Sequence, residues 1–538
     1  MINVHQALPG ACARNSRQLE APMRTILRGG RILTDHGLID ATLVILGTSI
    51  ESIVPRSKAW HPRPEDEVID CTGLVVAPGL VDMHSHDDIA VTHPALAEAK
   101  IRQGVTTTAI AMDGFGCAPL FGPHLDEVVQ YWKPVNGDPG PWVSTSLAEQ
   151  ARRYAGHLGL NVILNVPHAN LRILATGFDN RPLQGQQLLQ ATQSVADALD
   201  EGAAGLTTGL SYVPAVFSAR EELVALARPL RRQQRPYISH LRDYGTKLFE
   251  AVEEALTIGE ELDIPVHLSH LHLSHPTLFG QADALLETLH QAMHRGIRVT
   301  WDLYPYSAGS SILHAYLPVW LTEGGPAHLM NRLHDPKAIL RLAQDPSFAG
   351  FDWSRVVIAS TASGRYVGES ITAIAQKQQQ SPASAIAQLL VSESLDISCI
   401  VHQTDPADDD LLAQDDAAMV GSDGLPFGQR PHPRYFGAFA AFFAHHVKDL
   451  QMLTLEQAWR KMSTGSALYR ISDRGRLAAG AAADIAVFDP ETYAPQSTYE
   501  LPQKWAQGVH HVFINGTAVL QDGIFFPDAK PGQVLTPN

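Results

Sequence analysis

Paired histidines follow an apolar run near the start of this sequence. His84 and His86 come directly after LVVAPGLVDM, and alternate residues of a strand point to the same face. A His-X-His sequence at the end of a strand therefore aims two imidazoles at one point, which suits a metal ion. Such a pair is weak evidence by itself, but Asp87 and Asp88 follow it at once and strengthen the interpretation.

Two more histidines end later apolar runs. His240 ends RPYISH and His270 ends IPVHLSH, 30 residues further on, with a helical segment between them. That separation is the length of one βαβ unit, so neighbouring parallel strands would present the two imidazoles side by side. Each could singly be a hydrogen-bonded core histidine, but four histidines at three strand ends favour a shared metal. His267 is an odd number of positions from His270, so we expect it to point to the other face.

Two aspartates also end apolar runs. Asp423 ends AAMVGSD and Asp113 ends TTTAIAMD, and each could bind a metal, act as a general base or cap a turn. Imidazole and carboxylate together suit Zn²⁺, Mn, Fe or Co, and Zn²⁺ is favoured at a hydrolytic site with an open position. Such an ion is a Lewis acid that lowers the pKa of bound water to about 7. An unligated carboxylate nearby could take the proton and deliver it to a leaving amine.

Other kinds of site have little support in the sequence. It contains no GxSxG, GxxxxGK[ST] or HExxH segment, and its four cysteines form no CxxC pair. A reducing cytoplasm is therefore the expected compartment. The net charge of −16, from 40 Lys+Arg and 56 Asp+Glu, argues against a nucleic-acid partner. No apolar run reaches the roughly 18 residues of a membrane span, so no membrane partner is expected either.

The elements that must position these side chains alternate along the middle of the chain. Residues 248–262 have apolar residues at helical spacing, and eight runs have the character of strands. These runs are GLVVAPGLVDMHSH, GVTTTAIAMDG, NVILNVPH, GAAGLTTGL, RPYISH, IPVHLSH, IRVTWDLYPY and VVIAS. Alternating strands and helices predict a parallel sheet, and about eight units favour a closed (β/α)8 barrel over an open sheet. In either fold, functional side chains lie at the carboxyl ends of the strands.

Two β-rich ends flank this middle. We expect residues 23–76 and 476–538 to form a small β domain and residues 77–475 to form the barrel. Residues 309–396 are rich in Gly, Pro and Gln and break the rhythm, so we interpret them as an insertion over the barrel mouth, a candidate lid. Residues 1–22 are expected to be a disordered extension or an over-extended start.

The chain resembles the N-acyl-D-amino-acid deacylase (D-aminoacylase) family of the amidohydrolase superfamily. The resemblance covers nearly everything from Met23 onward. It rests on the segments APGLVDMHSHDD, QGVTTTAIAMDG, GLTTGLSY, YISHLRDYG, PVHLSH, DLYPYSAGS, GSDGLPFGQRPHPRYFGAF and DRGRLAAGAAADIAVFDP. It implies an α/β fold, a metal-dependent TIM barrel with a small β-sandwich built from both chain termini and an insertion that forms part of a substrate lid.

The resemblance also implies metal ligands. His84 and His86 would line the weaker metal position, and His240 and His270 would hold the tighter zinc. Asp423 would be both ligand and catalytic carboxylate.

The family's next ligand is a cysteine shortly after QGVTT, and this chain departs from the pattern there. Asp113 takes that position by direct alignment of the following glycine, whereas Cys117 would need a shifted register. A carboxylate can bridge two metals, so the change favours a fuller second site. It also weakens the preference for Zn²⁺ over Mn or Fe, because a soft thiolate is lost.

Four residues are expected to meet the substrate: Tyr212, Arg242, His272 and Tyr304. Tyr304 matches a family tyrosine used for carboxylate binding, and His272 stands where the family commonly has a carboxylate-binding lysine. A histidine pairs with an anion only while protonated, so His272 puts recognition of a plain D-amino-acid carboxylate in question. Tyr212 could polarise the scissile carbonyl and Arg242 could assist, the alternatives being a packed aromatic ring and a salt bridge to a helix.

We therefore expect a metal-dependent hydrolase that cleaves the amide C–N bond of a small N-acyl-D-amino acid or related N-acyl amine. A cyclic amide hydrolase of the dihydroorotase or hydantoinase type is one alternative, and a non-catalytic metal-binding protein is a remote one. The acyl group, the amine, the stereochemistry, the number of metals and the oligomeric state stay open. His168 and Arg172, in NVPHANLR, match a further family segment to which we assign no role.

Overall fold

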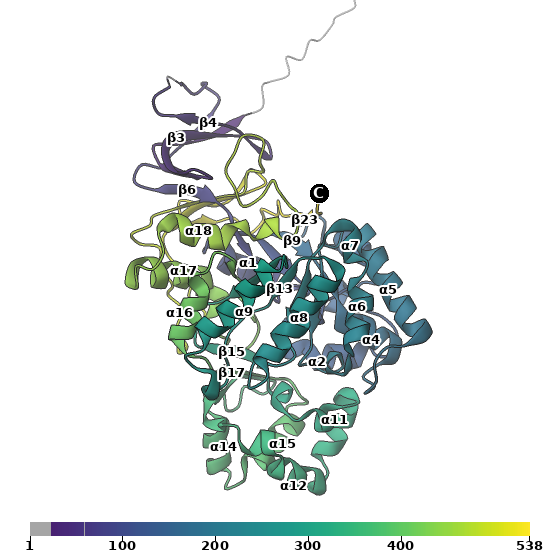
Figure 1. Ribbon diagram of the computed structural model, residues 1–538. Coiled ribbons are helices and arrows are strands. Elements are labelled where there is room, and N and C mark those ends of the chain that lie inside the picture. Colours follow the sequence, from purple (N-terminus) through teal and green to yellow (C-terminus); the bar gives the residue numbers. More distant parts are fainter. Residues whose placement is uncertain (1–22, 59) are drawn as a thin grey trace, which may run out of the picture.

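Eight parallel strands close into a barrel in the computed structural model, which describes residues 23–58 and 60–538 (Figure 1). The barrel strands are β7 (Leu80–Asp82), β8 (Val105–Ile110), β9 (Asn161–Leu164) continued by β10 (Val166–Pro167), β11 (Leu206–Gly209), β12 (Tyr237–His240), β13 (Val266–Leu268), β14 (Val299–Leu303) and β18 (Ala418–Val420). The ring closes where the Met83 amide donates to the Val420 carbonyl at 3.4 Å and Ser85 forms a parallel bridge with Gly424. The predicted barrel is confirmed.

The eighth barrel strand is not the one that we predicted. VVIAS lies in β16 (Val356–Thr361), which pairs with β17 (Ile397–His402) in a three-stranded antiparallel sheet completed by β15 (Ala308–Ile312). The last barrel strand is β18 instead. The prediction failed because a short apolar run has the same appearance in a buried parallel strand and in a buried antiparallel one.

Helices cover the outside of the barrel between its strands (Figure 1). They include α1 (Pro94–Ile101), α4 (His168–Thr176), α5 (Gly185–Asp200), α6 (Arg220–Ala227), α8 (Leu248–Leu262), α9 (Ala282–His294), α16 (Pro406–Gln414), α17 (Arg434–Phe443) and α18 (Leu455–Ser463). The helix predicted at residues 248–262 is confirmed as α8, whose apolar face joins the main core.

A ten-stranded sheet combines both ends of the chain, in the order β22-β21-β20-β19-β6-β2-β3-β1-β5 with β4 paired to β3. Its strands are β1 (Arg24–Arg28), β2 (Arg31–Thr34), β3 (Gly37–Leu46), β4 (Ser49–Pro55), β5 (Glu67–Asp70), β6 (Val75–Pro78), β19 (Ile485–Phe488), β20 (Val509–Ile514), β21 (Thr517–Gln521) and β22 (Ile524–Phe525). The end of the chain leaves this sheet. β23 (Val534–Leu535), which we assigned to the β domain, pairs in parallel with barrel strand β9.

The insertion between β14 and β18 builds a separate layer at the far end of the molecule from the β domain (Figure 1). Its antiparallel sheet carries α10 (Val319–Thr322), α11 (Gly325–Leu333), α12 (Pro336–Gln344), α13 (Pro346–Ala349), α14 (Ile371–Lys377) and α15 (Pro382–Ser392). These elements have a hydrophobic core of their own. The sheet extends past both ends of the predicted range 309–396, and a lid function stays a prediction.

Two expectations concern the remaining chain. The predicted extension, residues 1–22, lies outside the described residues. Within residues 23–58 and 60–538, every helix is too short or too polar to cross a bilayer.

Candidate metal centre

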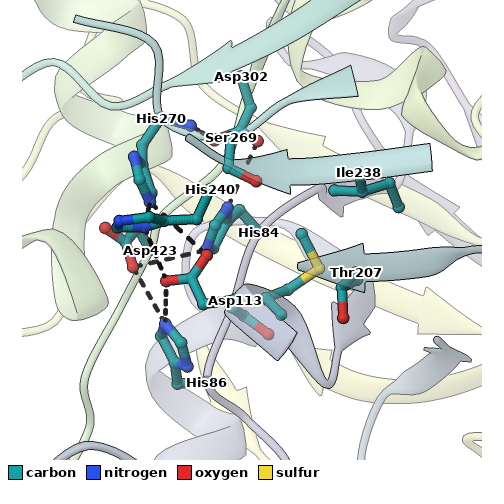
Figure 2. Close-up of polar contacts among 12 residues, drawn as sticks. His84, His86, Asp113, Thr207, Ile238, His240, Ser269, His270, Asp302 and Asp423 are labelled. Atoms are coloured by element: carbon teal, nitrogen blue, oxygen red, sulfur yellow. Dashed lines mark hydrogen bonds and ion pairs between the residues drawn. The ribbon is translucent and has the colours of Figure 1, made fainter. Parts of the chain in front are cut away.

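Six histidine and aspartate side chains meet at the carboxyl ends of the barrel strands (Figure 2). Their ligand atoms form two groups, and within each group all atoms lie within 4.8 Å of one another. One group is His84, His86, Asp113 and Asp423, and the other is Asp113, His240 and His270. All six are buried. Because Asp113 belongs to both groups, it would bridge two ion positions.

The distances within the groups suit a small divalent ion. His86 Nε2 lies 3.2 Å from Asp423 Oδ1, and His84 Nε2 lies 3.4 Å from Asp113 Oδ1. His240 Nδ1 lies 3.4 Å from Asp113 Oδ2. Two ligands on a tetrahedral zinc with bonds of 2.0–2.1 Å are about 3.3 Å apart.

Unpaired polar atoms provide an independent test of this fit. Among the described residues, Nε2 of His84 and Oδ1 of Asp113 are buried without a hydrogen-bond partner. His240 Nδ1 and His270 Nε2 face each other at 3.0 Å, while Ser211 Oγ lies 2.7 Å from the other nitrogen of His240. Buried polar groups are rarely left unpaired. These residues therefore fit a bound metal ion, which would occupy the lone pairs that they direct at one another.

Three of the ligands adopt left-handed backbone conformations. Their φ angles are 56° at Asp113, 31° at His270 and 45° at Asp423. This region costs an L-residue roughly 1–2 kcal/mol, although Asp and His enter it more readily than most side chains. Each turn redirects a side chain into the site just past its strand, so backbone strain is concentrated where the ligands converge.

His267 does not point away from the site as we predicted. It is buried, and its Nε2 lies 2.9 Å from Asp302 Oδ2, the same oxygen that lies 3.5 Å from His84 Nδ1. The alternation of faces holds only inside a strand, and β13 ends at Leu268. His270 reaches the site through its left-handed turn and not through strand alternation.

Asp302 contacts two residues of the ligand groups, and sequence reasoning missed it. Its Oδ2 is the carboxylate oxygen nearest to His84 Nδ1, at 3.5 Å, and its Oδ1 accepts the His270 amide at 2.9 Å. Burial would raise the pKa of Asp302, but the neighbouring His84 and His267 lower it far below the usual value. A carboxylate behind a ligand histidine fixes its tautomer and directs Nε2 to the metal. The available signal was an aspartate inside the apolar run IRVTWDL.

The carboxylates of the centre are anionic. Burial opposes their charge, but His240 and His84 lower the pKa of Asp113 well below its usual value. In the same way, Arg434 and His86 lower the pKa of Asp423. Two acceptors for a cation are thus ready at neutral pH.

A buried lysine joins the first barrel strand to the last. Lys100 Nζ contacts Asp82 and lies 2.7 Å from Ser422 Oγ. Asp82 Oδ1 in turn accepts the Ser422 amide at 2.8 Å and the His84 amide at 3.3 Å. This network holds the His84 and Asp423 turns together across the closure of the barrel.

Two cavities adjoin the metal centre. The larger, about 560 Å³, is lined by Tyr212, His272 and Tyr304 among others. The smaller, about 40 Å³, is lined by aromatic residues that include Phe115 and Trp132, and by Tyr212 again. Three of the four predicted substrate residues are therefore at the site.

Arg242 is the predicted substrate residue that the structure does not bring there. Its guanidinium makes two 2.9 Å hydrogen bonds to Glu254 of α8 and donates to the carbonyls of Val216 and Ser218. Arg242 therefore forms the salt bridge to a helix that we gave as the alternative to substrate binding.

A different arginine adjoins the site, and we did not single it out from the sequence. Arg434, the first residue of α17, is fully buried, and its Nη2 lies 2.9 Å from Asp423 Oδ2. Its guanidinium carbon lies 4.4 Å from the centre of the Tyr304 ring. Within residues 23–58 and 60–538, its Nε and Nη1 have no hydrogen-bond partner. A buried guanidinium with unpaired N–H groups is suited to bind an anion.

No model of a known protein family matches the chain. The chain is 31% identical over 523 residues to the D-aminoacylase of Alcaligenes xylosoxydans xylosoxydans, an alignment that covers 94% of this chain and 96% of that protein. The chain belongs to the D-aminoacylase family of amidohydrolases. The resemblance predicted from the sequence is thereby confirmed, and the chain is a metal-dependent amidohydrolase acting on C–N bonds other than peptide bonds.

Two further members of the D-aminoacylase family resemble this one. An N-acyl-D-glutamate deacylase of the same bacterium is 30% identical, covering 96% of this chain and 97% of that protein. The crystal structure of N-acyl-D-glutamate deacylase from Bordetella bronchiseptica, complexed with zinc and a phosphonate inhibitor that mimics the tetrahedral intermediate, matches with a TM-score of 0.80. The two chains are 28% identical, and the match covers 96% of this chain and 100% of that one.

His168 and Arg172, to which we assigned no role, belong to a buried network in this D-aminoacylase relative. Both contact Glu222 of α6, which also accepts the Leu183 amide at 2.8 Å. Burial would raise the pKa of Glu222, but the hydrogen bond from His168 and the charge of Arg172 lower it from 4.5 to about 2. The network ties α4 to α6 and lies outside the two ligand groups.

Glu222 should make the free energy of unfolding depend on pH. Its lowered folded-state pKa contributes stability that is complete above the unfolded value of 4.5 and lost as the pH falls toward about 2. This is about 3 kcal/mol in all, of which about 2 kcal/mol is gone at pH 3. We expect urea unfolding to show that the free energy of unfolding falls between pH 6 and pH 3 by about 2 kcal/mol more in the parent than in Glu222→Gln. The exposed neighbour Glu221→Gln is the control and should follow the parent.

Proposed function

We propose that this chain is a zinc-dependent deacylase of N-acyl-D-amino acids with a short acyl group. The observation that carries the proposal is the buried, partly unpaired guanidinium of Arg434 beside Asp423 and the ligand groups. An arginine at this position can bind the carboxylate of an amino acid whose amide is held at the metal centre. The deacylase names of three relatives support the same substrate class.

The ligand set would hold one or two ions, with Asp113 shared between them. A bound divalent ion would supply a Lewis acid and lower the pKa of a water at the site. The family's zinc-complexed structure supports Zn²⁺, and the all-oxygen-and-nitrogen donor set leaves Mn, Fe and Co as competitors.

Asp423 is suited to move the proton. Its Oδ2 is held by Arg434 Nη2, Oδ1 lies 3.2 Å from His86 Nε2, and Asp423 lines both cavities. Its lowered pKa keeps it in the basic form, so that it can accept a proton from water. Oδ1 can then deliver this proton to the departing amide nitrogen.

Tyr212 is suited to polarise the amide carbonyl. It lines both cavities, and its ring centre lies 4.7 Å from that of the ligand His240. Burial raises the pKa of Tyr212 well above its usual value, so the hydroxyl stays protonated and donates. A donor that meets the carbonyl oxygen stabilises the charge developing there.

The two cavities divide an N-acyl amino acid between them. The aromatic pocket of about 40 Å³ suits a short acyl chain, because roughly 10–15 Å³ is needed for each water-sized group. The larger cavity, which Tyr304 and Asp423 line, suits the amino-acid part, and Arg434, in contact with both of these residues, would receive the carboxylate. His272 contributes little charge there, because burial and the neighbouring His270 lower its pKa well below the usual value.

Substrate panels test the proposal. The purified protein, its metal content measured, is incubated with N-acetyl-D-amino acids, their L-enantiomers, N-acyl amines, hydantoins and lactams, and released amine or ring opening is quantified. We expect turnover of N-acetyl-D-amino acids that is lost with a chelator and restored by Zn²⁺. Activity on rings only would make the chain a cyclic amide hydrolase. Absence of any turnover with metal bound would favour the non-catalytic alternative.

Arg434→Met should separate carboxylate recognition from chemistry. We expect kcat/KM for an N-acetyl-D-amino acid to fall about 10- to 100-fold relative to that for its carboxamide, since an ionic hydrogen bond is worth about 1.5–3 kcal/mol. Any effect of Arg434→Met that acts through Asp423 is common to both substrates, so it cancels in the ratio of their kcat/KM values. Arg430→Met is a matched control, because the Arg430 side chain donates to the Tyr499 carbonyl and not to the site. An unchanged ratio in Arg434→Met would exclude Arg434 as the carboxylate partner.

A further inference from the structure

A third cluster of metal-ligating side chains lies outside the two ligand groups of the barrel. It consists of Asp410 on α16 with His445 and His446 on Ala444–Asp449, a π-helical segment that continues α17. One ligand atom from each residue lies within 4.8 Å of the other two. Helix α17 begins at Arg434, so one continuous helical element carries this cluster at one end and the proposed carboxylate partner at the other.

Both imidazoles of this cluster converge on the same carboxylate oxygen. His445 Nε2 lies 2.9 Å and His446 Nε2 lies 3.2 Å from Asp410 Oδ1. Ligands on a tetrahedral zinc are separated by about 3.3 Å, so the spacing already matches. Successive residues of an α-helix point about 100° apart. His445 and His446 are successive residues of the wider π turn, and there both rings reach Asp410. Such π segments are frequent at functional sites.

The hydrogen bonding of His446 leaves a lone pair aimed at Asp410. His446 Nδ1 lies 3.0 Å from the Phe442 carbonyl, which can only accept, so Nδ1 carries the hydrogen. Nε2 is buried and makes no hydrogen bond to any described residue, even though the Asp410 carboxylate is 3.2 Å away. A lone pair facing a carboxylate is stable only with a cation between them.

An ion can reach the cluster from a neighbouring cavity of about 220 Å³. His445 is 39% exposed along its side chain, and Asp409 adds a second carboxylate to the cavity wall. Tyr304 lines the same cavity from the side of the barrel. Two imidazoles and a carboxylate with open positions suit Zn²⁺, Co²⁺ or Ni²⁺, whereas Ca²⁺ and Mg²⁺ prefer oxygen ligands alone.

We propose that Asp410, His445 and His446 bind one divalent transition-metal ion, separately from the ions of the barrel. The ion joins α16 to the end of α17 and lies on the far side of Tyr304 from the substrate cavity. Its role is to anchor the helix that begins at Arg434 and the loop that carries Tyr304. The proposal does not depend on which substrate the enzyme takes.

Zinc stoichiometry of the intact enzyme tests this site. Parent and variants are dialysed against rising ZnCl2, and bound zinc is measured by mass spectrometry together with the melting temperature. We expect the parent to bind about one equivalent more than His445→Gln and Asp410→Asn, and to gain more in melting temperature from zinc. His445 is partly exposed, so its replacement leaves the core intact.

A matched control removes a histidine from a pair that has no third ligand among the described residues. His290 Nε2 lies 2.6 Å from Asp415 Oδ2 on the surface, and His290→Gln should bind as much zinc as the parent. The same zinc content in the parent, His445→Gln and Asp410→Asn at every concentration would overturn the proposal and leave a protonated His–Asp pair. Loss of zinc from His290→Gln as well would also overturn it, because any surface His–Asp pair would then suffice.

Discussion

Asp423→Asn is expected to lower kcat for an N-acetyl-D-amino acid by about 10²- to 10⁴-fold, the range typical of a lost general acid–base group. The amide has the size of the carboxylate and keeps an oxygen that can face His86, but it cannot accept and return a proton. Metal content should therefore stay close to that of the parent. Steady-state kinetics at saturating Zn²⁺, with bound metal measured on the same samples, checks both parts of the expectation.

The control for this substitution lies at the other end of the same strand. Asp416 is exposed just before β18, whereas Asp423 follows its carboxyl end, so Asp416→Asn should leave kcat within a few-fold of the parent. A kcat for Asp423→Asn within the same few-fold would remove Asp423 from proton transfer. If activity and metal were lost together, Asp423 would act chiefly as a ligand.

The barrel and the convergence of its histidine and aspartate side chains were predictable because strand ends leave a strong signal. His84, His86 and His240 lie in or just after buried strands, and the parallel order of those strands brings them together. His270 also lies where we predicted, but the same reasoning failed at His267, because the chain leaves the strand before His270, which has a left-handed backbone conformation. Side-chain direction after a strand depends on such turns, which alternating apolar patterns do not encode.

The residues behind the ligands were harder to predict. Asp302 and Arg434 are charged side chains in apolar segments, and only their contacts reveal that they support His84 and Asp423. Arg242 looked equally plausible as a substrate residue, but Glu254, 12 residues further along the chain, occupies its guanidinium. Tertiary packing decides which of the two arginines has unpaired N–H groups. A single sequence does not show this packing.

The β-rich chain ends show a similar limit. The Asn515–Gly516 pair predicts a hairpin turn, and it lies between β20 and β21 with φ angles of 48° and 74°. The residue types of the turn were therefore enough to predict this hairpin. The pairing of β23 with β9 and the transfer of VVIAS to the insertion depend on contacts between distant segments, which local patterns do not specify.

Asp113→Ala is expected to remove most of the metal and, with it, nearly all activity. Asp113 belongs to both ligand groups, so its loss weakens two ion positions at once. If the 10–16 kcal/mol of a structural zinc site is shared among four ligands, each is worth about 3 kcal/mol, or roughly a hundredfold in affinity. The metal content after dialysis against dilute chelator, followed by kcat at rising Zn²⁺, measures this effect.

Substitutions at two positions decide whether Asp113 or Cys117 supplies the ligand. Asp113→Cys restores the residue type that the resemblance implies there, so it should retain one ion and shift the preference toward Zn²⁺ over Mn²⁺, because thiolate is the softer ligand. Cys117 is buried in an apolar cluster outside both ligand groups, and Cys117→Ala should keep the metal content and kcat of the parent. The reverse result, with metal lost in Cys117→Ala and kept in Asp113→Ala, would require the shifted register and end the bridging role of Asp113. Full metal content in Asp113→Ala alone would show that His84, His86, His240 and His270 suffice.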